Sequence, residues 1–451
     1  MPTNSAKLSA IIDILRCPLT GEALAFTEEG NLQTESGAQA YPMLNGVPWL
    51  LSRPRNSLLD WSAKLNHFQQ SLLHEIAALE AELVSEPSIV SSTQARIQTL
   101  LHGKKQFLVE ITQLMQPLAT TKITSRAVYD ALRDRAPMQQ NLLSYEANIY
   151  RDWVWGDEEN QQSMALLESI APESLGKLCV MGAGACKLAL DVHQQLMPDL
   201  TVATDINPLF LLAMQQLLAG ETLSLTEFPL QPKSSECVSI CHDIAIDTRK
   251  TDNFHLAFSD AAKPAFAAAA FDTVLTPWLI DIQPHALLVF LKQLNHYLPI
   301  GGVWLNLGSL VFHQARDVLC YSREEIDSIA EQAGFVLEHC EQQSIPYLKS
   351  PYNAGHRVET VWVWRARKIA DAERVKDLQD KPDWLLDPEL PVPALAEFAT
   401  AAQQNRLLTE ILERIDGKVS TTAIARKLAQ QYQADEAEMR HMLHAYLNEL
   451  L

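Results

Sequence analysis

The stretch from Lys177 to Asp205 constrains the fold more than any other part of this chain. It opens with a short apolar run at 178–181, which has the length of a buried strand. Gly182 and Gly184 follow at once, and a helical run and a second short strand then lead to Asp205. This order predicts the opening of a nucleotide-binding α/β sheet, in which the glycines permit a sharp turn near the ligand and the acid accepts hydrogen bonds from ribose hydroxyls.

The glycine turn departs from the dinucleotide fingerprint at its third position, where Lys187 stands instead of glycine. A pyrophosphate needs a close helix N-terminus, whereas a sulfonium nucleoside needs only the turn and the acid. The departure therefore favours S-adenosylmethionine over NAD, and an NAD-dependent dehydrogenase would also need a hydride-transfer acid. A tight turn without a ligand is the remaining interpretation, which the spacing of Asp205 from the glycines disfavours.

Length and composition limit the classes of protein. At 451 residues the chain is expected to form roughly two to four domains, and 47% hydrophobic with 20% charged residues is typical of a globular protein. The net charge of −19 argues against a nucleic-acid surface, which needs clustered Lys and Arg. No apolar run has the length of a membrane span or the form of a signal peptide, and the seven cysteines are scattered. We therefore expect a reduced cytoplasmic protein, without nucleic-acid or membrane partners. The sequence predicts no particular oligomeric state.

Spacing and composition divide the chain into five segments. Apolar residues recur with helical spacing over 58–118, which predicts two long helices that serve for packing or as a dimer surface. The expected segments are an N-terminal unit at 1–56, a helical arm at 57–140, an α/β domain at 141–369, a linker at 370–398 and a C-terminal unit at 399–451.

The N-terminal unit contains "ILRCPLTG", with Cys17, and "AYPMLNGVPWL" at 40–50. These blocks resemble the zinc-ribbon-like activator subunit of tRNA and protein methyltransferases. The zinc form of that family needs paired cysteines, but Thr20 and Ser36-Gly37 stand where the partners of Cys17 are expected. One thiolate cannot hold a tetrahedral zinc ion, so we expect a metal-free unit with Cys17 in its core.

The C-terminal unit has the pattern of three short helices. Asp416-Gly417 follows the first, Ser420 is placed to cap the second, and Asp435 begins the third. The pattern resembles the PqqD-like peptide-binding module, a small winged-helix-like fold. That resemblance implies a partner peptide at this unit.

Strands and helices alternate within the α/β domain, which places ligand-binding groups at the carboxyl ends of parallel strands. Expected strands at 271–276 and 303–307 lead to further polar side chains, and Asp260 stands where such folds present an acid to the adenine amino group. The groups expected at this edge are Gly182, Asp205, Asp260, Asp281 and His313.

A metal site in the α/β domain is a weaker alternative. A strand is expected at 236–240, with Cys237 and Cys241 on one face and His242 after it. No second pair of ligands lies nearby in the sequence, so we expect no metal there.

The segment before the glycine turn contains Arg151-Asp152-Trp153. It suits a lid over the cofactor, with Arg151 near the methionyl carboxylate, and it suits an N-terminal docking helix equally well. The sequence leaves both interpretations open.

Blocks between 140 and 368 resemble the carnosine N-methyltransferase family, which implies a class I methyltransferase with a Rossmann-like sheet and S-adenosylmethionine as cofactor. The blocks are "RDW", "GAGACKLALDV", "FDTVLTPWLID", "GGVWLNLGSLVFH", "YSREEIDSIAEQAGF" and "IPYLKSPYN". The resemblance places Trp278, Asp281, His313 and Tyr347 around the imidazole and peptide of the substrate.

Asp281 and His313 are the catalytic candidates under this resemblance. Asp281 can accept a hydrogen bond from the ring proton of an imidazole and fix its tautomer, and His313 can do the same or take the released proton. Two other interpretations stay open, namely that Asp281 caps the helix starting near Pro284 and that His313 is an interior residue with satisfied hydrogen bonds.

One departure from the family concerns the acceptor. The tyrosine-rich segment that helps to bind carnosine is replaced by Arg357-Val358-Glu359. A small molecule or a histidine-containing peptide, methylated on an imidazole or amine, therefore fits better than carnosine, and Arg357 is a candidate for binding it. The alternative is a catalytically silent scaffold that binds a partner peptide or protein.

Overall fold

The computed structural model describes residues 8–85, 89–119, 142, 145–312, 314, 316–373 and 390–449. The chain divides into two compact units, residues 1–378 and 379–451. Among the described residues, no helix is long and apolar enough to cross a membrane.

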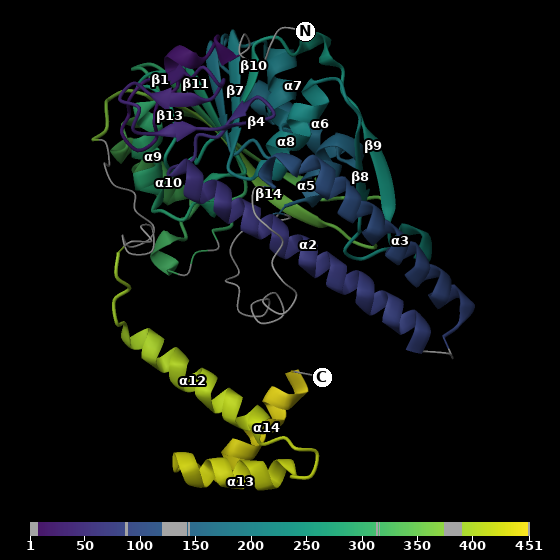
Figure 1. Ribbon diagram of the computed structural model, residues 1–451. Coiled ribbons are helices and arrows are strands. Elements are labelled where there is room, and N and C mark those ends of the chain that lie inside the picture. Colours follow the sequence, from purple (N-terminus) through teal and green to yellow (C-terminus); the bar gives the residue numbers. More distant parts are fainter. Residues whose placement is uncertain are drawn as a thin grey trace. The chain divides into compact units, whose positions relative to one another are not determined.

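A seven-stranded sheet lies at the centre of the first unit (Figure 1). Its strand order is β10-β7-β6-β11-β12-β14-β13, in which β14 alone runs antiparallel to the other six strands. The strands are β6 (Lys177–Met181), β7 (Leu200–Asp205), β10 (Phe254–Phe258), β11 (Thr273–Pro277), β12 (Val303–Gly308), β13 (Phe335–Tyr347) and β14 (Arg357–Lys368). This is the mostly parallel α/β arrangement that the glycine turn predicts.

Helices cover both faces of this sheet, because successive side chains of a strand point to opposite sides. In β6, Leu178 and Val180 belong to one hydrophobic core, and Cys179 and Met181 belong to the other. The first core includes α6 (Asp157–Ile170), α7 (Lys187–Leu196) and α8 (Pro208–Leu218), and the second includes α9 (Leu287–His296) and α10 (Arg323–Gln332).

The N-terminal unit packs against the edge of the sheet formed by β10. Leu50 donates its backbone N–H to the carbonyl of Phe258 at 2.9 Å, and the rings of Trp49 and Phe258 lie 4.9 Å apart. Arg16 donates likewise to the carbonyl of Ala265 at 2.8 Å. The unit consists of η1 (Ile12–Ile14), β1 (Leu24–Phe26), β2 (Leu32–Thr34), β3 (Ala40–Tyr41), β4 (Met43–Leu44) and β5 (Val47–Pro48).

Two long helices, α2 (Pro54–Ser85) and α3 (Ser91–Leu114), form the expected arm as far as it is described, and a short turn, η2 (Gln116–Leu118), follows. Residues 120–140 of the expected arm lie outside the described residues. The α3 helix packs on the hairpin of β8 (Leu223–Glu227) and β9 (Ile240–Ile244), where Glu110 accepts the backbone N–H of Thr226 at 2.8 Å. The arm is therefore anchored to the α/β domain.

The second unit contains α12 (Ala396–Glu413), α13 (Thr421–Tyr432) and α14 (Glu436–Glu449) among its described residues. Its apolar core includes Ile411, Leu428 and Leu443. Ser420 caps α13 by accepting the N–H of Ala423 at 3.3 Å, and Asp435 accepts the N–H of Ala437 at 2.9 Å at the start of α14. Both caps are those that the sequence predicts.

Candidate active site

The glycine turn follows β6 and uses left-handed backbone at both glycines. Gly182 has φ +71° and Gly184 has φ +52°, a region that favours glycine. A Cβ atom on Gly182 would lie 2.7 Å from the side chain of Leu279, whereas one on Gly184 would meet no described atom within 4 Å. Gly182 thus allows close packing against the loop after β11, and Gly184 leaves open space at the strand ends.

Asp205 ties this turn to the end of β7. One carboxylate oxygen accepts the N–H of Gly184 at 2.9 Å, and the other accepts the N–H of Asn207 at 2.8 Å. Burial raises the pKa of Asp205, although these backbone N–H groups oppose the change. Each carboxylate oxygen can accept a second hydrogen bond, so Asp205 still suits the predicted ribose contact.

Asp260 lies on the same edge of the sheet, two residues beyond the end of β10. Phe258 pairs in register with Asp205, and Ser259 donates its N–H to the backbone carbonyl of Asp205 at 3.2 Å, so the loop containing Asp260 starts beside the end of β7. Asp260 accepts the N–H of Ala262 at 2.9 Å, which fixes the start of this loop.

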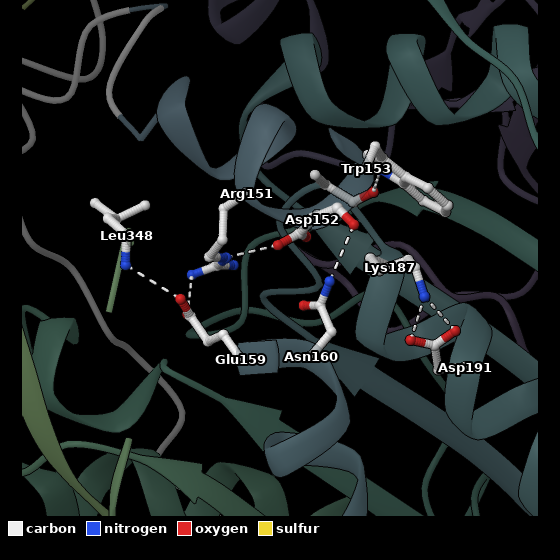
Figure 2. Close-up of polar contacts among 9 residues, drawn as sticks. Arg151, Asp152, Trp153, Glu159, Asn160, Lys187, Asp191 and Leu348 are labelled. Carbon is white, nitrogen blue, oxygen red and sulfur yellow. Dashed lines mark hydrogen bonds and ion pairs between the residues drawn. The ribbon is translucent and has the colours of Figure 1, made fainter. Parts of the chain in front are cut away.

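The "RDW" segment forms a π-turn, η3 (Arg151–Trp155). Gly156 closes it by donating its N–H to the carbonyl of Arg151 at 2.7 Å, and a Cβ atom there would lie 2.1 Å from that carbonyl oxygen. The indole N–H of Trp153 donates to the carbonyl of Ala185 at 2.9 Å (Figure 2). The π-turn therefore contacts the glycine turn directly, in a conformation that is frequent at functional sites.

Arg151 lies, partly buried, between two carboxylates (Figure 2). Its Nε lies 2.7 Å from an oxygen of Asp152, and a terminal nitrogen lies 3.3 Å from an oxygen of Glu159. Burial lowers the pKa of Arg151, but these carboxylates outweigh it and keep the pKa above its usual value. Burial raises the pKa of Glu159 to about 7, although Arg151 opposes the change.

An aromatic and cationic group lies where β11 and β13 end. The rings of Trp278 and Tyr347 are 5.0 Å apart, and the Arg357 guanidinium lies 4.3 Å from the Tyr347 ring. Arg151 approaches the same ring at 5.8 Å. Trp278 has φ +50°, which is uncommon for a bulky residue and worth noting at a candidate site.

Asp281 lies in the short helix η6 (Ile280–Ile282) after β11 and is 6% exposed. The hydroxyl of Ser309, which follows β12, donates to its carboxylate at 2.9 Å. The helix near Pro284 begins at Leu287 with Ala286 at its N-cap position, so Asp281 does not occupy that cap. His313 lies outside the described residues.

The structure thus groups the candidates on two sides. Gly182, Gly184, Asp205 and Asp260 lie along the ends of β6, β7 and β10. Trp278 and Arg357 each contact the ring of Tyr347, and Arg151 approaches the same ring from the π-turn. Sequence reasoning missed Glu159 and Ser309. Ser309 lies within the "WLNLGSLVFH" block, which was a usable signal, whereas Glu159 lies in an ordinary acidic helix start.

The expected strand at 236–240 is wrong. Residues 235–237 form a 3₁₀ turn, and the strand β9 starts at Ile240. Cys237 is therefore not on a strand face with Cys241, because the serine-rich segment before it forms the turn instead. Among the described residues, no group of three or more His, Cys, Asp or Glu side chains is arranged to hold a metal ion.

Comparisons with known proteins show the family. Residues 138–368 match the sequence model of carnosine N-methyltransferase, and residues 400–451 match that of coenzyme PQQ synthesis protein D (PqqD). No curated protein sequence matches this chain.

Solved structures of similar arrangement include three methyltransferase structures. Phosphoethanolamine N-methyltransferase 2 from Haemonchus contortus, in complex with S-adenosylmethionine, is 14% identical with a TM-score of 0.34, covering 53% of this chain and 60% of that chain. An S-adenosylmethionine-dependent methyltransferase from Methanosarcina mazei is 11% identical with a TM-score of 0.31, covering 45% of this chain and 97% of that chain. A chain in a complex of the Haloferax volcanii Trm112 methyltransferase activator with a methyltransferase is 11% identical with a TM-score of 0.35, covering 51% of this chain and 96% of that chain.

Both resemblances predicted for the α/β domain and for the C-terminal unit are confirmed by the family matches. Because the first match spans more than half of the 451 residues, this chain belongs to the carnosine N-methyltransferase family and is an S-adenosylmethionine-dependent methyltransferase of class I fold.

Proposed function

We propose that this methyltransferase acts on a nitrogen of an imidazole or amine in a histidine-containing peptide or a small molecule. The observation that supports this most is the contact between Trp278 and Tyr347, together with the buried carboxylate of Asp281 in the short helix η6 that follows Trp278. Aromatic rings can stack on a flat acceptor ring, and the carboxylate can select its protonation state.

The cofactor fits the glycine edge of the sheet. When bound, S-adenosylmethionine supplies an electrophilic methyl group. Gly182, Gly184 and Asp205 are the proposed holders of its nucleoside, because the turn is open at Gly184 and Asp205 has lone pairs left for ribose hydroxyls. Asp260 is the proposed contact of the adenine, and Arg151 that of the methionyl carboxylate.

The chain's own part in the reaction is mainly positioning. Asp281, held by Ser309, accepts the hydrogen bond of the ring N–H and leaves the lone pair of the other ring nitrogen free to react. Methylation of that nitrogen makes the ring N–H acidic, so its proton is proposed to pass to Asp281 and from there to His313. Trp278 and Tyr347 hold the ring, and Arg357 adds a cation against the Tyr347 ring.

Carnosine itself is not the proposed acceptor. Arg357 forms an ion pair with Glu359 at 2.7 Å in the place of the family's tyrosine-rich segment, so charged groups line that end of the site. The family match does not favour a silent scaffold.

Mass spectrometry of the purified chain tests this proposal. The chain is incubated with S-adenosylmethionine and a panel containing histidine, histamine, carnosine and other histidine-containing dipeptides, and we expect one compound other than carnosine to gain a methyl group. If S-adenosylhomocysteine binds to the chain but no compound on the panel is methylated, the proposed acceptor class is contradicted.

A further inference from the structure

We propose that Glu159 is a positioning residue that makes the acceptor side of the site depend on occupancy of the cofactor side. The inference rests on the proposed function, because it assigns Arg151 and the glycine turn to the cofactor and Tyr347 to the acceptor. Glu159 is 4% exposed and contacts both sides with one carboxylate.

The acceptor side depends on Glu159 through Leu348. The backbone N–H of Leu348, directly after Tyr347, donates to Glu159 at 3.1 Å (Figure 2). Leu348 has φ +53°, a left-handed conformation that leucine rarely adopts. Such a conformation persists only where its surroundings fix it, and Glu159 supplies one of the contacts that do so.

The cofactor side reaches Glu159 through the π-turn. Trp153 donates to the carbonyl of Ala185, at the end of the glycine turn, and the next helix starts with Lys187, whose ammonium lies 5.7 Å from the Trp153 ring. Arg151, at the start of the same π-turn, contacts the other oxygen of Glu159. A ligand that orders the glycine turn therefore also orders the group that contacts Glu159.

A purely structural link would not need a charged residue here. Asp152 already neutralises Arg151, and a glutamine could accept the N–H of Leu348. A buried carboxylate is less favourable than a buried amide unless an attraction offsets the cost. What the carboxylate adds is attraction to Arg151, so the charge links the two sides.

Hydrogen–deuterium exchange of the full chain at a pH of about 8, above the pKa of Glu159, tests the inference without an acceptor. S-adenosylhomocysteine should slow exchange of the peptide at 345–352 by at least about fivefold, the lower end of typical coupling between two sites. Glu159→Gln should still bind S-adenosylhomocysteine but lose this slowing. The matched control is Glu158→Gln, which removes the neighbouring exposed carboxylate that contacts Lys349 at 2.8 Å and should keep the slowing.

A second variant keeps the test decisive if Glu159→Gln folds poorly. Glu159→Asp keeps the charge but is one methylene too short to reach both Arg151 and Leu348, so it should lose the slowing as well. Two results would overturn the inference and leave the proposed function standing. In the first, S-adenosylhomocysteine binds to the wild-type chain but exchange at 345–352 is unchanged. In the second, exchange at 345–352 is slowed in both Glu159 variants as much as in the wild-type chain. Absence of binding to the wild-type chain would overturn both.

Discussion

The cofactor side and the acceptor side of this site are built in different ways. The glycine turn and Asp205 come from one continuous stretch, Lys177 to Asp205, in which a strand, a turn, a helix and a strand follow at fixed spacing. The proposed acceptor side is assembled from Trp278 and the β13–β14 hairpin, which are far apart in the sequence. Local spacing therefore forms the proposed nucleoside side, and tertiary packing forms the proposed acceptor side.

The two sides also differ in which residues adopt left-handed backbone conformation. The left-handed positions of the glycine turn are Gly182 and Gly184, for which this region is unstrained, and Cys186, which has a small side chain. On the acceptor side, Trp278 and Leu348 adopt left-handed backbone although they have large side chains. We infer that the acceptor side depends more on surrounding contacts to keep its shape.

The largest expected effect is on turnover at the acceptor side. Asp281→Asn keeps the side-chain shape but removes the charge that selects the imidazole tautomer, so we expect turnover to fall by about 10²-fold or more. The affinity for S-adenosylhomocysteine should not change. Steady-state kinetics and calorimetry measure the two quantities separately.

A matched control for that variant lies at the other end of the same strand. Asp272→Asn, before β11, alters a carboxylate that accepts the N–H of Lys177 at 2.8 Å at the amino ends of the strands, opposite the carboxyl ends where the candidate site lies, and it should retain wild-type turnover. Wild-type turnover in Asp281→Asn, or loss of cofactor binding, would show that Asp281 does not belong to the acceptor side.

The next effect is on cofactor affinity. Asp205→Ala removes charge-assisted hydrogen bonds to the ribose and frees the N–H of Gly184, so binding of S-adenosylhomocysteine should weaken by about 1–3 kcal/mol. Calorimetry checks this. An unchanged dissociation constant would mean that Asp205 only fixes the glycine turn.

A smaller effect, on stability, concerns the residue between the two sides. The pKa of Glu159 is raised by burial from 4.5 to about 7, and the charged groups that face it are Arg151, Asp152 and Arg357. A carboxyl group with a higher pKa in the folded state binds more protons when folded, so its contribution to stability is lost as the pH rises through about 7.

Glu159→Gln should not show this loss. The free energy of unfolding of the variant, relative to wild type, should therefore increase between about pH 5 and about pH 8, by an amount on the order of 1–3 kcal/mol. Denaturant unfolding at several pH values measures the difference. A constant difference across this range would show that Glu159 stays ionised throughout.

The smallest expected effect is that of a chelator. The thiol of Cys17 lies 3.0 Å from the hydroxyl of Tyr41 and accepts the N–H of Thr20 at 3.4 Å, so protein groups surround it. Metal analysis should find no zinc, and EDTA should leave the melting temperature unchanged. One zinc ion per chain would show that ligands outside the activator pattern bind it.

The sequence predicts the parts of this molecule that depend on local patterns. The glycine turn, the strands after which Trp278 and Ser309 stand, and the caps Ser420 and Asp435 all follow from spacing and residue type. The contact between Glu159 and Leu348 joins residues 189 positions apart, which no local pattern reports. The π-turn depends on the absence of a Cβ atom at Gly156, and a glycine at that place suggests an ordinary helix break just as well.

The contact of the N-terminal unit with β10 has a consequence for how the enzyme responds to concentration. A separate activator subunit dissociates on dilution, whereas a partner on the same chain stays at an effective concentration on the order of millimolar. Leu50 and Phe258 belong to one chain, so dilution does not separate the N-terminal unit from the end of β10 and the loop with Asp260 that follows it.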